Sequence, residues 1–214
     1  MGWLYFDQYY LIFVVPALIF SIIMQVKVKR TFAKFSQVSN SKGLTGELAA
    51  KRVLFHYGIN DVAVERVGGN LTDHYDPRSN VIRLSENVYD STSVAAVGIA
   101  CHEAGHAAQH AHKYLPIKIR NAVLPVANIG STLGLPLAIL GYFMGYGPLI
   151  TIGLLLYALI AVFQIVTLPV EFNASRRAVK VMDEDGMLFD EELYAAKKVL
   201  SAAALTYVAA LAVT

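Results

Sequence analysis

The feature that most limits the fold of this chain is a run of 50 residues, 121–170, without Asp, Glu, Lys, Arg or His. One membrane-spanning helix needs about 20 apolar residues, so the run is long enough for two. Gly and Pro occur together in "GYGP" at 145–148 and favour a chain reversal near its middle. The sequence therefore predicts two transmembrane helices, at about 122–144 and 149–169, that form a hairpin across the bilayer.

Two further segments are apolar enough to enter a membrane. Residues 8–26 carry no charge and are followed by the basic "KVKR". A cleaved signal peptide would have its basic residues before the apolar run, so we interpret this segment as a retained transmembrane anchor. Residues 199–214 are also uncharged but shorter than a span. They predict a packed helix or a partial fourth transmembrane helix.

The basic residues indicate how the predicted spans are oriented. They follow the first span, precede the second and follow the third, so all lie on one side of the membrane, which the positive-inside rule makes the cytoplasm. They are Lys27, Lys29, Arg30, Lys34, Lys113, Lys118, Arg120, Arg176, Arg177 and Lys180. These flanks account for the net charge of +2, so nothing in the charge predicts a nucleic-acid partner. The single cysteine, Cys101, excludes an internal disulfide.

The remaining residues, about 27–120 and 170–198, are expected to lie in the cytoplasm. With an apolar composition of 56%, the chain is predicted to be a mainly α integral membrane protein that forms one membrane-embedded domain, 1–214. The lipid bilayer is therefore its first expected partner.

Local patterns predict the elements outside the spans. Helical periodicity indicates a helix within 27–60. Alternating, β-branched residues predict two short strands, 62–67 and 80–85, separated by a turn and a polar loop. A segment rich in small residues predicts a helix over about 91–112, which Pro116 ends.

That last helix carries "HEAGH" at 102–106. Residues four apart on a helix lie one turn apart on nearly the same face, so His102 and His106 can bind one ion. Glu103 lies beside them and can reach a water on that ion. This is the HExxH pattern of zinc hydrolases, and two imidazoles with one oxygen ligand and an open position favour Zn²⁺. The alternative is a polar, histidine-rich helix that faces lipid headgroups.

Two other histidines are weaker candidates for a third ligand. His112 has the spacing of the HExxHxxGxxH pattern, which needs a glycine where this chain has Gln109. Without that glycine the helix continues and carries His112 too far along its axis. His110 cannot reach an ion centred between the two HExxH histidines. Both are expected to be exposed.

Glu171 is the competing third ligand. It lies in "LPVEFNASRRAVKVMDEDG", a segment in which Pro169 is expected to begin a helix just beyond the third span. The predicted hairpin returns the chain to the side of the membrane where the HExxH helix lies. An interfacial carboxylate paired with Arg176 or Lys180 is the other interpretation.

Four segments, "HEAGHA", "EFNASRRA", "DHYDPRSNVIRLS" and "AALTYVAA", together resemble the YugP-type neutral zinc metallopeptidases. These bacterial membrane proteins are similar in plan to the HtpX and CAAX-prenyl proteases. The resemblance implies a small α+β zincin-like cytoplasmic catalytic unit with a short β-sheet, in the bacterial plasma membrane. It also implies a gluzincin endopeptidase with Glu103 as general base and with three zinc ligands: His102, His106 and Glu171.

Two further roles follow from the same resemblance, and a third follows from position in the sequence. HtpX relatives carry Asp where this chain has Ser175, so Ser175 or Asn173 is expected to orient a ligand histidine. The segment "NVIRLS" is expected to lie beside the metal cleft, where a peptide could pair with it. Arg176 is the predicted catalytic donor to the oxyanion, because it lies on the ligand helix. The other candidates for that role are Arg177, His74, Tyr75 and His110.

The favoured function is a membrane-bound endopeptidase that hydrolyses peptide bonds of protein or peptide substrates by zinc-activated water, with Glu103 as general base. A partner subunit or a homo-oligomer could present the substrate. The alternative is a non-catalytic, zinc-binding membrane scaffold that recruits partner proteins. A carrier or channel is disfavoured, because the predicted spans contain no charged residue.

Overall fold

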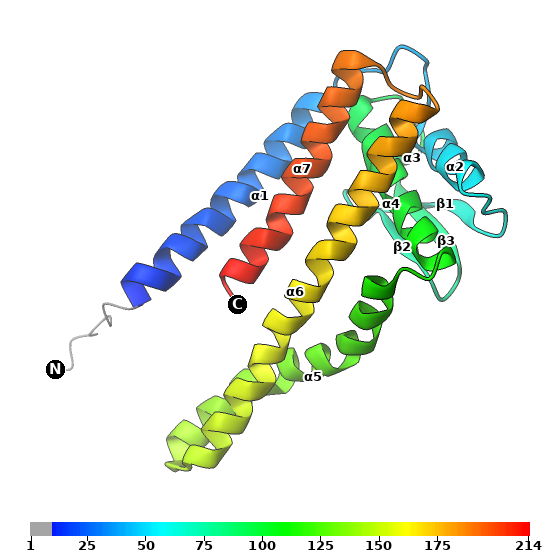
Figure 1. Ribbon diagram of the computed structural model, residues 1–214. Helices are drawn as coiled ribbons and strands as arrows, with labels where there is room; N and C mark the ends of the chain where they lie inside the picture. Colours follow the sequence, from blue (N-terminus) through cyan, green and yellow to red (C-terminus); the bar gives the residue numbers. More distant parts are fainter. Residues whose placement is uncertain (1–9) are drawn as a thin grey trace.

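The computed structural model describes residues 10–214, so the first two residues of the predicted anchor, 8–26, lie outside the described part. The described chain is mainly helical with one small sheet, in agreement with the predicted class (Figure 1). In chain order the elements are η1 (Tyr10–Val14), α1 (Val15–Phe35), α2 (Gly46–His56), β1 (Ala63–Val67), β2 (His74–Asp76), β3 (Val81–Ser85), α3 (Glu86–Tyr89), α4 (Val94–Ala111), α5 (Leu115–Met144), α6 (Gly147–Glu184) and α7 (Asp190–Ala212).

Four of these helices are long and apolar enough to cross a membrane: α1 with η1, α5, α6 and α7. The predicted spans 122–144 and 149–169 lie within α5 and α6. The C-terminal segment predicted at 199–214 belongs to a longer helix, because α7 begins at Asp190 and is 23 residues long. Its first turn holds three acidic residues, which suit the positive end of the helix dipole.

The prediction that a separate helix begins at Pro169 is wrong. Pro169 lies inside α6, which runs without interruption for 38 residues from Gly147 to Glu184. A proline inside a helix is tolerated when neighbouring groups compensate for its missing N–H. One continuous helix therefore carries both the predicted third span and Glu171.

The hairpin of α5 and α6 forms where "GYGP" predicts a reversal. Gly145 ends α5 in the left-handed conformation, with a φ of 64°, which a residue without Cβ adopts readily. The two helices then approach closely, because a Cβ on Gly153 would lie 2.4 Å from the backbone nitrogen of Ala138. Close backbone contact through small residues is typical of helix pairs in membranes.

The sheet has the order β1-β3-β2, with β1 parallel and β2 antiparallel to β3. The strands predicted at 62–67 and 80–85 match β1 and β3 to within one residue at each end. Strand β2 was not expected, because it is three residues long and lies in the segment interpreted as a polar loop. It forms the edge of the sheet that contacts α4.

Helix α4 lies at the centre of the fold, in contact with α2, α6, α7 and the sheet. Ser93 caps it by accepting a hydrogen bond from the backbone N–H of Ala96 at 3.2 Å. Its small residues allow neighbours to pack on several sides, and 13 of its 18 residues are buried. The helix predicted within 27–60 is interrupted, because α1 ends at Phe35 and α2 begins at Gly46.

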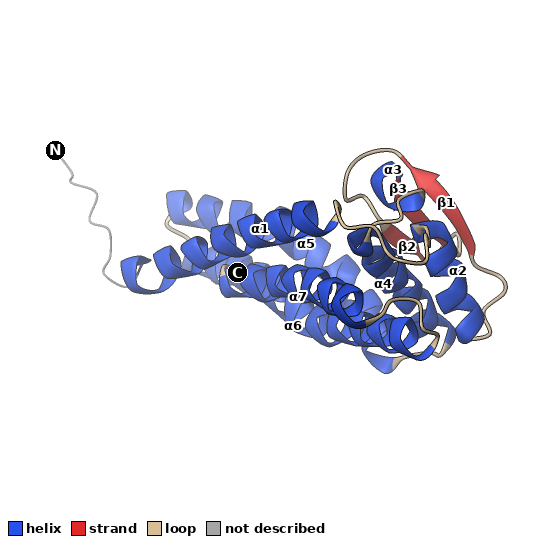
Figure 2. Ribbon diagram, turned by 90° about the horizontal axis from the view of Figure 1, so that it is seen from above, coloured by secondary structure: helices blue, strands red, loops and turns tan. Residues whose placement is uncertain are grey.

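The sheet and the shorter helices gather at one end of the molecule, and the long helices extend away from them (Figures 1 and 2). Helices α1 and α7 lie side by side, and the hairpin of α5 and α6 extends furthest from the sheet. The outward side chains of this hairpin are apolar and exposed, such as Leu135 at 49% and Leu155 at 65%. Such a surface suits contact with lipid.

Candidate metal centre

His102 and His106 point their rings toward the same place from successive turns of α4. Their Nε2 atoms are 3.1 Å apart, and the rings meet edge to face with centroids 4.7 Å apart. Both side chains are mostly buried, with exposed fractions of 15% and 12%. The helix geometry expected of the HExxH pattern therefore brings two potential ligand nitrogens together.

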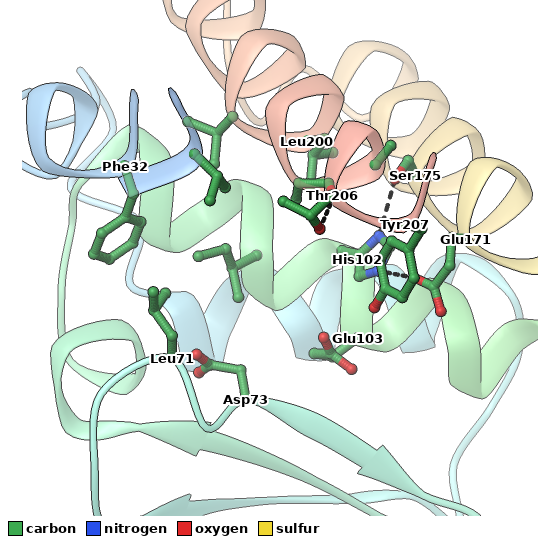
Figure 3. Close-up of a pocket in the computed structure, with 15 residues that line it drawn as sticks. Phe32, Leu71, Asp73, His102, Glu103, Glu171, Ser175, Leu200, Thr206 and Tyr207 are labelled. Atoms are coloured by element: carbon green, nitrogen blue, oxygen red, sulfur yellow. Dashed lines mark hydrogen bonds and ion pairs between the residues drawn. The ribbon is translucent and has the colours of Figure 1, made fainter. Parts of the chain in front are cut away.

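Helix α6 brings Glu171 to the same point, as the close-up in Figure 3 shows. Its Oε2 lies 3.3 Å from His102 Nε2 and 3.5 Å from His106 Nε2. This oxygen is buried and accepts no hydrogen bond from any residue in the described range 10–214. A buried carboxylate oxygen without a donor calls for a cation.

The three ligand atoms form a triangle that fits zinc. Its edges are 3.1, 3.3 and 3.5 Å long. Zinc binds nitrogen and oxygen at about 2.0–2.2 Å in tetrahedral geometry, which separates two ligands by roughly 3.4 Å. Two imidazoles and a carboxylate are also a donor set that zinc hydrolases use. This group, His102, His106 and Glu171, is called the triad below.

Each triad histidine has a partner at its other ring nitrogen. His102 Nδ1 lies 3.1 Å from Ser175 Oγ, and His106 Nδ1 lies 3.1 Å from Gln109 Oε1. The Gln109 oxygen can only accept, so it requires a proton on His106 Nδ1 and leaves Nε2 free to bind a metal.

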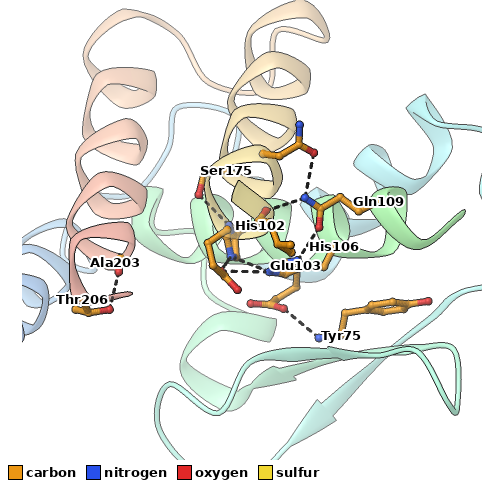
Figure 4. Close-up of polar contacts among 11 residues, drawn as sticks. Tyr75, His102, Glu103, His106, Gln109, Ser175, Ala203 and Thr206 are labelled. Atoms are coloured by element: carbon orange, nitrogen blue, oxygen red, sulfur yellow. Dashed lines mark hydrogen bonds and ion pairs between the residues drawn. The ribbon is translucent and has the colours of Figure 1, made fainter. Parts of the chain in front are cut away.

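Gln109 also connects the two helices that carry the triad. It is completely buried, and its Nε2 donates to the carbonyl oxygen of Val170 at 2.7 Å and to Asn173 Oδ1 at 3.0 Å. Asn173 Oδ1 accepts a second hydrogen bond, from Arg177 Nε, at 2.9 Å. Figure 4 shows Gln109 beside His106, with its hydrogen bonds to α6. Of the two residues expected to orient a ligand histidine, Ser175 contacts His102 directly. Asn173 is connected to His106 through Gln109.

Glu103 is buried next to the triad, with an exposed fraction of 9%. Its Oε2 accepts a hydrogen bond from the backbone N–H of Tyr75 on β2, at 3.0 Å (Figure 4). The edge strand that sequence patterns missed therefore fixes one oxygen of the carboxylate. The other oxygen is left for a different partner.

Two cavities meet at the triad. The first has a volume of about 290 Å³, and its walls beyond the triad are mainly apolar (Figure 3). Helix α1 contributes Phe32, the loop before β2 contributes Leu71, and α7 contributes Leu200 and Ala203. The second, of about 170 Å³, is more polar and contains His74, Arg120 and Tyr207. Glu103 lines both cavities.

Burial and nearby carboxylates shift the pKa values of three groups in or near the triad. Burial acts to lower the pKa of His106, but the nearby Glu171 and Glu103 carboxylates outweigh it, so the pKa lies above its ordinary value. Burial raises the pKa of Asp73, although hydrogen bonds from Ser85 oppose the shift. Burial alone raises the pKa of the Cys101 thiol, which agrees with a packing role for that side chain.

The structure does not bring every predicted residue to the triad. Arg176 is exposed and lines a separate groove with Phe172 and Val179, outside both cavities at the triad. Its place in the helix turns it away. The polar cavity instead holds potential donors from other elements, namely His74, Arg120, Asn121 and Tyr207.

The expectation that His110 and His112 are exposed is met. His110 Nδ1 lies 3.2 Å from the hydroxyl of Tyr75, and His112 caps the C-terminus of α4. Neither belongs to the triad.

Comparison with known proteins shows the family of the chain. A family model described as "Putative neutral zinc metallopeptidase" matches residues 10–214. The chain therefore belongs to this family of zinc metallopeptidases, as the resemblance predicted. It is 46% identical over 196 residues to the "Putative membrane protease YugP" of Bacillus subtilis (strain 168), which covers 92% of this chain and 87% of the relative. No solved structure matches the chain.

Proposed function

We propose that this protein is a membrane-bound zinc endopeptidase of the gluzincin type, with His102, His106 and Glu171 as ligands. The triangle of ligand atoms, with edges of 3.1–3.5 Å, carries the proposal. Membership of a zinc metallopeptidase family supports the choice of metal. When bound, zinc would polarise a peptide carbonyl and lower the pKa of a water toward ~7.

Glu103 is the general base in this proposal. The Tyr75 N–H holds its Oε2, so Oε1 is the atom that takes a proton from the attacking water. The same carboxylate then delivers this proton to the leaving amine. The low exposure of Glu103 favours the transfer, because few solvent molecules reach the carboxylate to compete for the proton.

The two cavities suggest how a peptide is held. Arg120 and Tyr207 are the proposed donors to a developing oxyanion among the side chains that line the polar cavity, which also include His74 and Asn121. The apolar cavity next to the triad is large enough for one large apolar side chain of the substrate. The proposed substrate is therefore a peptide segment with such a residue near the cleaved bond, as membrane-adjacent and unfolded segments have.

The length of α6 supports cleavage close to the membrane surface. Glu171 is 24 residues after Gly147, which corresponds to about 36 Å of helix, whereas the hydrocarbon core is about 30 Å thick. We place this surface on the cytoplasmic side of the bacterial plasma membrane, from the distribution of basic residues. Because α1 and α7 line the apolar cavity beside the triad, the chain is best regarded as one domain.

The proposal is tested by changing Glu103→Gln in the full-length protein in detergent, with fluorescently labelled unfolded casein as substrate. Removal of a general base is expected to lower the cleavage rate at least 100-fold. Zinc content should stay near that of the unmodified protein, because Glu103 is not a ligand. The matched control is Glu86→Gln, which changes an exposed carboxylate on α3 and should leave the rate unchanged.

Cleavage at the same rate by folded Glu103→Gln protein would overturn the proposal. Zinc binding without cleavage by either form would favour the scaffold interpretation instead. Treatment with a chelator should abolish cleavage, and added zinc should restore it.

A further inference from the structure

A cationic groove lies between α1 and α7 and shares no lining residue with the apolar cavity. It has a volume of about 420 Å³. The cations that line it are Lys27, Arg30 and Lys34 on α1 and Lys198 on α7, and Ser201 and Thr31 add hydroxyl groups. Among residues 10–214, no acidic side chain lines it.

The spacing of these residues explains why they converge. Lys27, Arg30 and Lys34 are three and four residues apart, which places them on one face of α1. Helix α7 packs against this part of α1 and presents Lys198 across the groove. Within residues 10–214, none of the four cations has a carboxylate within the 4 Å of an ion pair. The mutual repulsion of such a cluster is relieved when an anion binds among the charges.

The groove continues into an apolar hollow along α1. This hollow, of about 470 Å³, shares Lys27, Arg30 and Thr31 with the groove and is otherwise lined by Ile22, Ile23 and Val26. Its apolar residues belong to the uncharged part of α1, and Lys27 is the first charged residue after it. Cationic and apolar surfaces thus follow one another along α1, in the same order as the headgroup and the acyl chain of a phospholipid.

We propose that this groove binds the headgroup of an anionic phospholipid, with Lys27, Arg30, Lys34 and Lys198 around the phosphate and an acyl chain along Ile22, Ile23 and Val26. Basic pockets between membrane helices recognise anionic headgroups in this manner. The apolar continuation distinguishes a lipid from a free phosphate ion, which would gain nothing from it. The bound lipid would join α1 to α7, two helices that also form a wall of the apolar cavity. The site does not depend on peptide cleavage.

The test is native mass spectrometry of the full-length protein in an uncharged detergent. Equal amounts of phosphatidylglycerol and phosphatidylcholine are added, and the ratio of the two bound lipids is measured. We expect phosphatidylglycerol to be preferred at a stoichiometry near one. Changing all four groove cations to Gln should abolish the preference, and Arg30→Gln alone should lower it about threefold to fivefold.

Matched controls distinguish lipid binding at the groove from a general electrostatic attraction of anionic lipid to the protein. Lys29→Gln changes the residue next to Arg30, which does not line the groove, and should keep the preference. A control with Lys29, Lys51, Arg52 and Lys180 changed to Gln loses the same total charge and should also keep it. An equal loss in this control and in the groove variant would overturn the proposal. Displacement of phosphatidylglycerol by equimolar inorganic phosphate would also overturn it, because a free anion would then be the preferred ligand.

Discussion

Gly105 on α4 lies directly against the backbone of Ala174 on α6. A Cβ on Gly105 would be 2.7 Å from the carbonyl oxygen of Ala174, a distance that real Cβ atoms do not reach. The contact explains why the helix of His102 and His106 can approach the helix of Glu171 closely enough to form the triad. A glycine lowers helix propensity, so the close approach is a physical reason for its presence here.

Gly105→Ala should therefore separate α4 from α6. The expected result is a loss of about 1–3 kcal/mol in the free energy of unfolding, as for other overpacked sites, together with weaker zinc binding. Gly98→Ala is the matched control on the same helix, because its Cβ would lie 3.5 Å from the Cβ of Ala196, an ordinary contact. That change should leave zinc binding intact and stability equal or higher. Denaturant unfolding and zinc titration measure both effects, and equal behaviour of the two variants would contradict this account.

Gln109→Leu should weaken zinc binding while the protein remains folded. The change removes the acceptor at His106 Nδ1 and the donor to the Val170 carbonyl. Loss of such a partner typically costs 10–100-fold in metal affinity. Nitrogen NMR of the histidine rings should also show a changed tautomer population for His106, which a purely packing role for Gln109 would not produce. Gln25→Leu, at an exposed position on α1, is the control.

Asp73 and Asp76 should affect the pH dependence of stability in opposite directions. Burial raises the folded-state pKa of Asp73 above 3.8. The contribution of Asp73 to the free energy of unfolding is therefore full below that pH and is lost as pH rises through the folded pKa. Asp73→Asn should therefore be at least as stable as the unmodified protein at pH ~7, provided that the amide keeps the hydrogen bonds from Ser85.

For Asp76, hydrogen bonds from Ser79, Arg78 and Arg83 lower the folded-state pKa. The contribution of Asp76 to the free energy of unfolding is therefore present above pH 3.8 and is lost as pH falls through the folded pKa. Asp76→Asn should be less stable than the unmodified protein at neutral pH, and the difference should shrink in acid. Thermal unfolding of the metal-free proteins, followed from neutral to acidic pH, measures both effects. Shifts of the same sign for the two variants would contradict these assignments.

Ala203→Phe should fill the apolar cavity beside the triad. The expected result is slower cleavage of peptides with a large apolar residue near the cleaved bond, with a smaller effect on peptides that have alanine there. The cleavage rate of the peptides with a large apolar residue should fall about 10-fold or more, because the filled cavity can no longer accept that side chain. Ala212→Phe, at an exposed position on the same helix, should change neither rate. An unaltered preference in the Ala203 variant would show that the cavity does not hold the substrate.

Much of the helical architecture could be predicted from local patterns. The uncharged run and the "GYGP" reversal predicted the hairpin, and alternating β-branched residues predicted β1 and β3. Residue spacing alone also predicted that His102 and His106 share a face of α4. These features depend on short-range geometry, which the sequence displays directly.

Other features depend on contacts between distant segments. Strand β2 is too short to show a period, yet its Tyr75 N–H binds Glu103. In the sequence, Gln109 is visible only as a departure from a glycine pattern, because nothing local indicates its hydrogen bonds to α6. The prediction for Arg176 rests on its position in sequence, but the rotation of α6 turns it out of the two cavities at the triad. Tyr207 lies in "AALTYVAA", one of the segments that carry the family resemblance, and this resemblance is the sequence signal for it.

In the proposed site, His102, His106 and Glu171 together hold one zinc ion. The most direct measurement is zinc per chain, by elemental mass spectrometry, in detergent-purified unmodified protein, Glu171→Ala and His112→Ala. We predict about one zinc in the unmodified protein and in His112→Ala, and loss or strong weakening of binding in Glu171→Ala. Full zinc occupancy in folded Glu171→Ala, or loss confined to His112→Ala, would contradict the account.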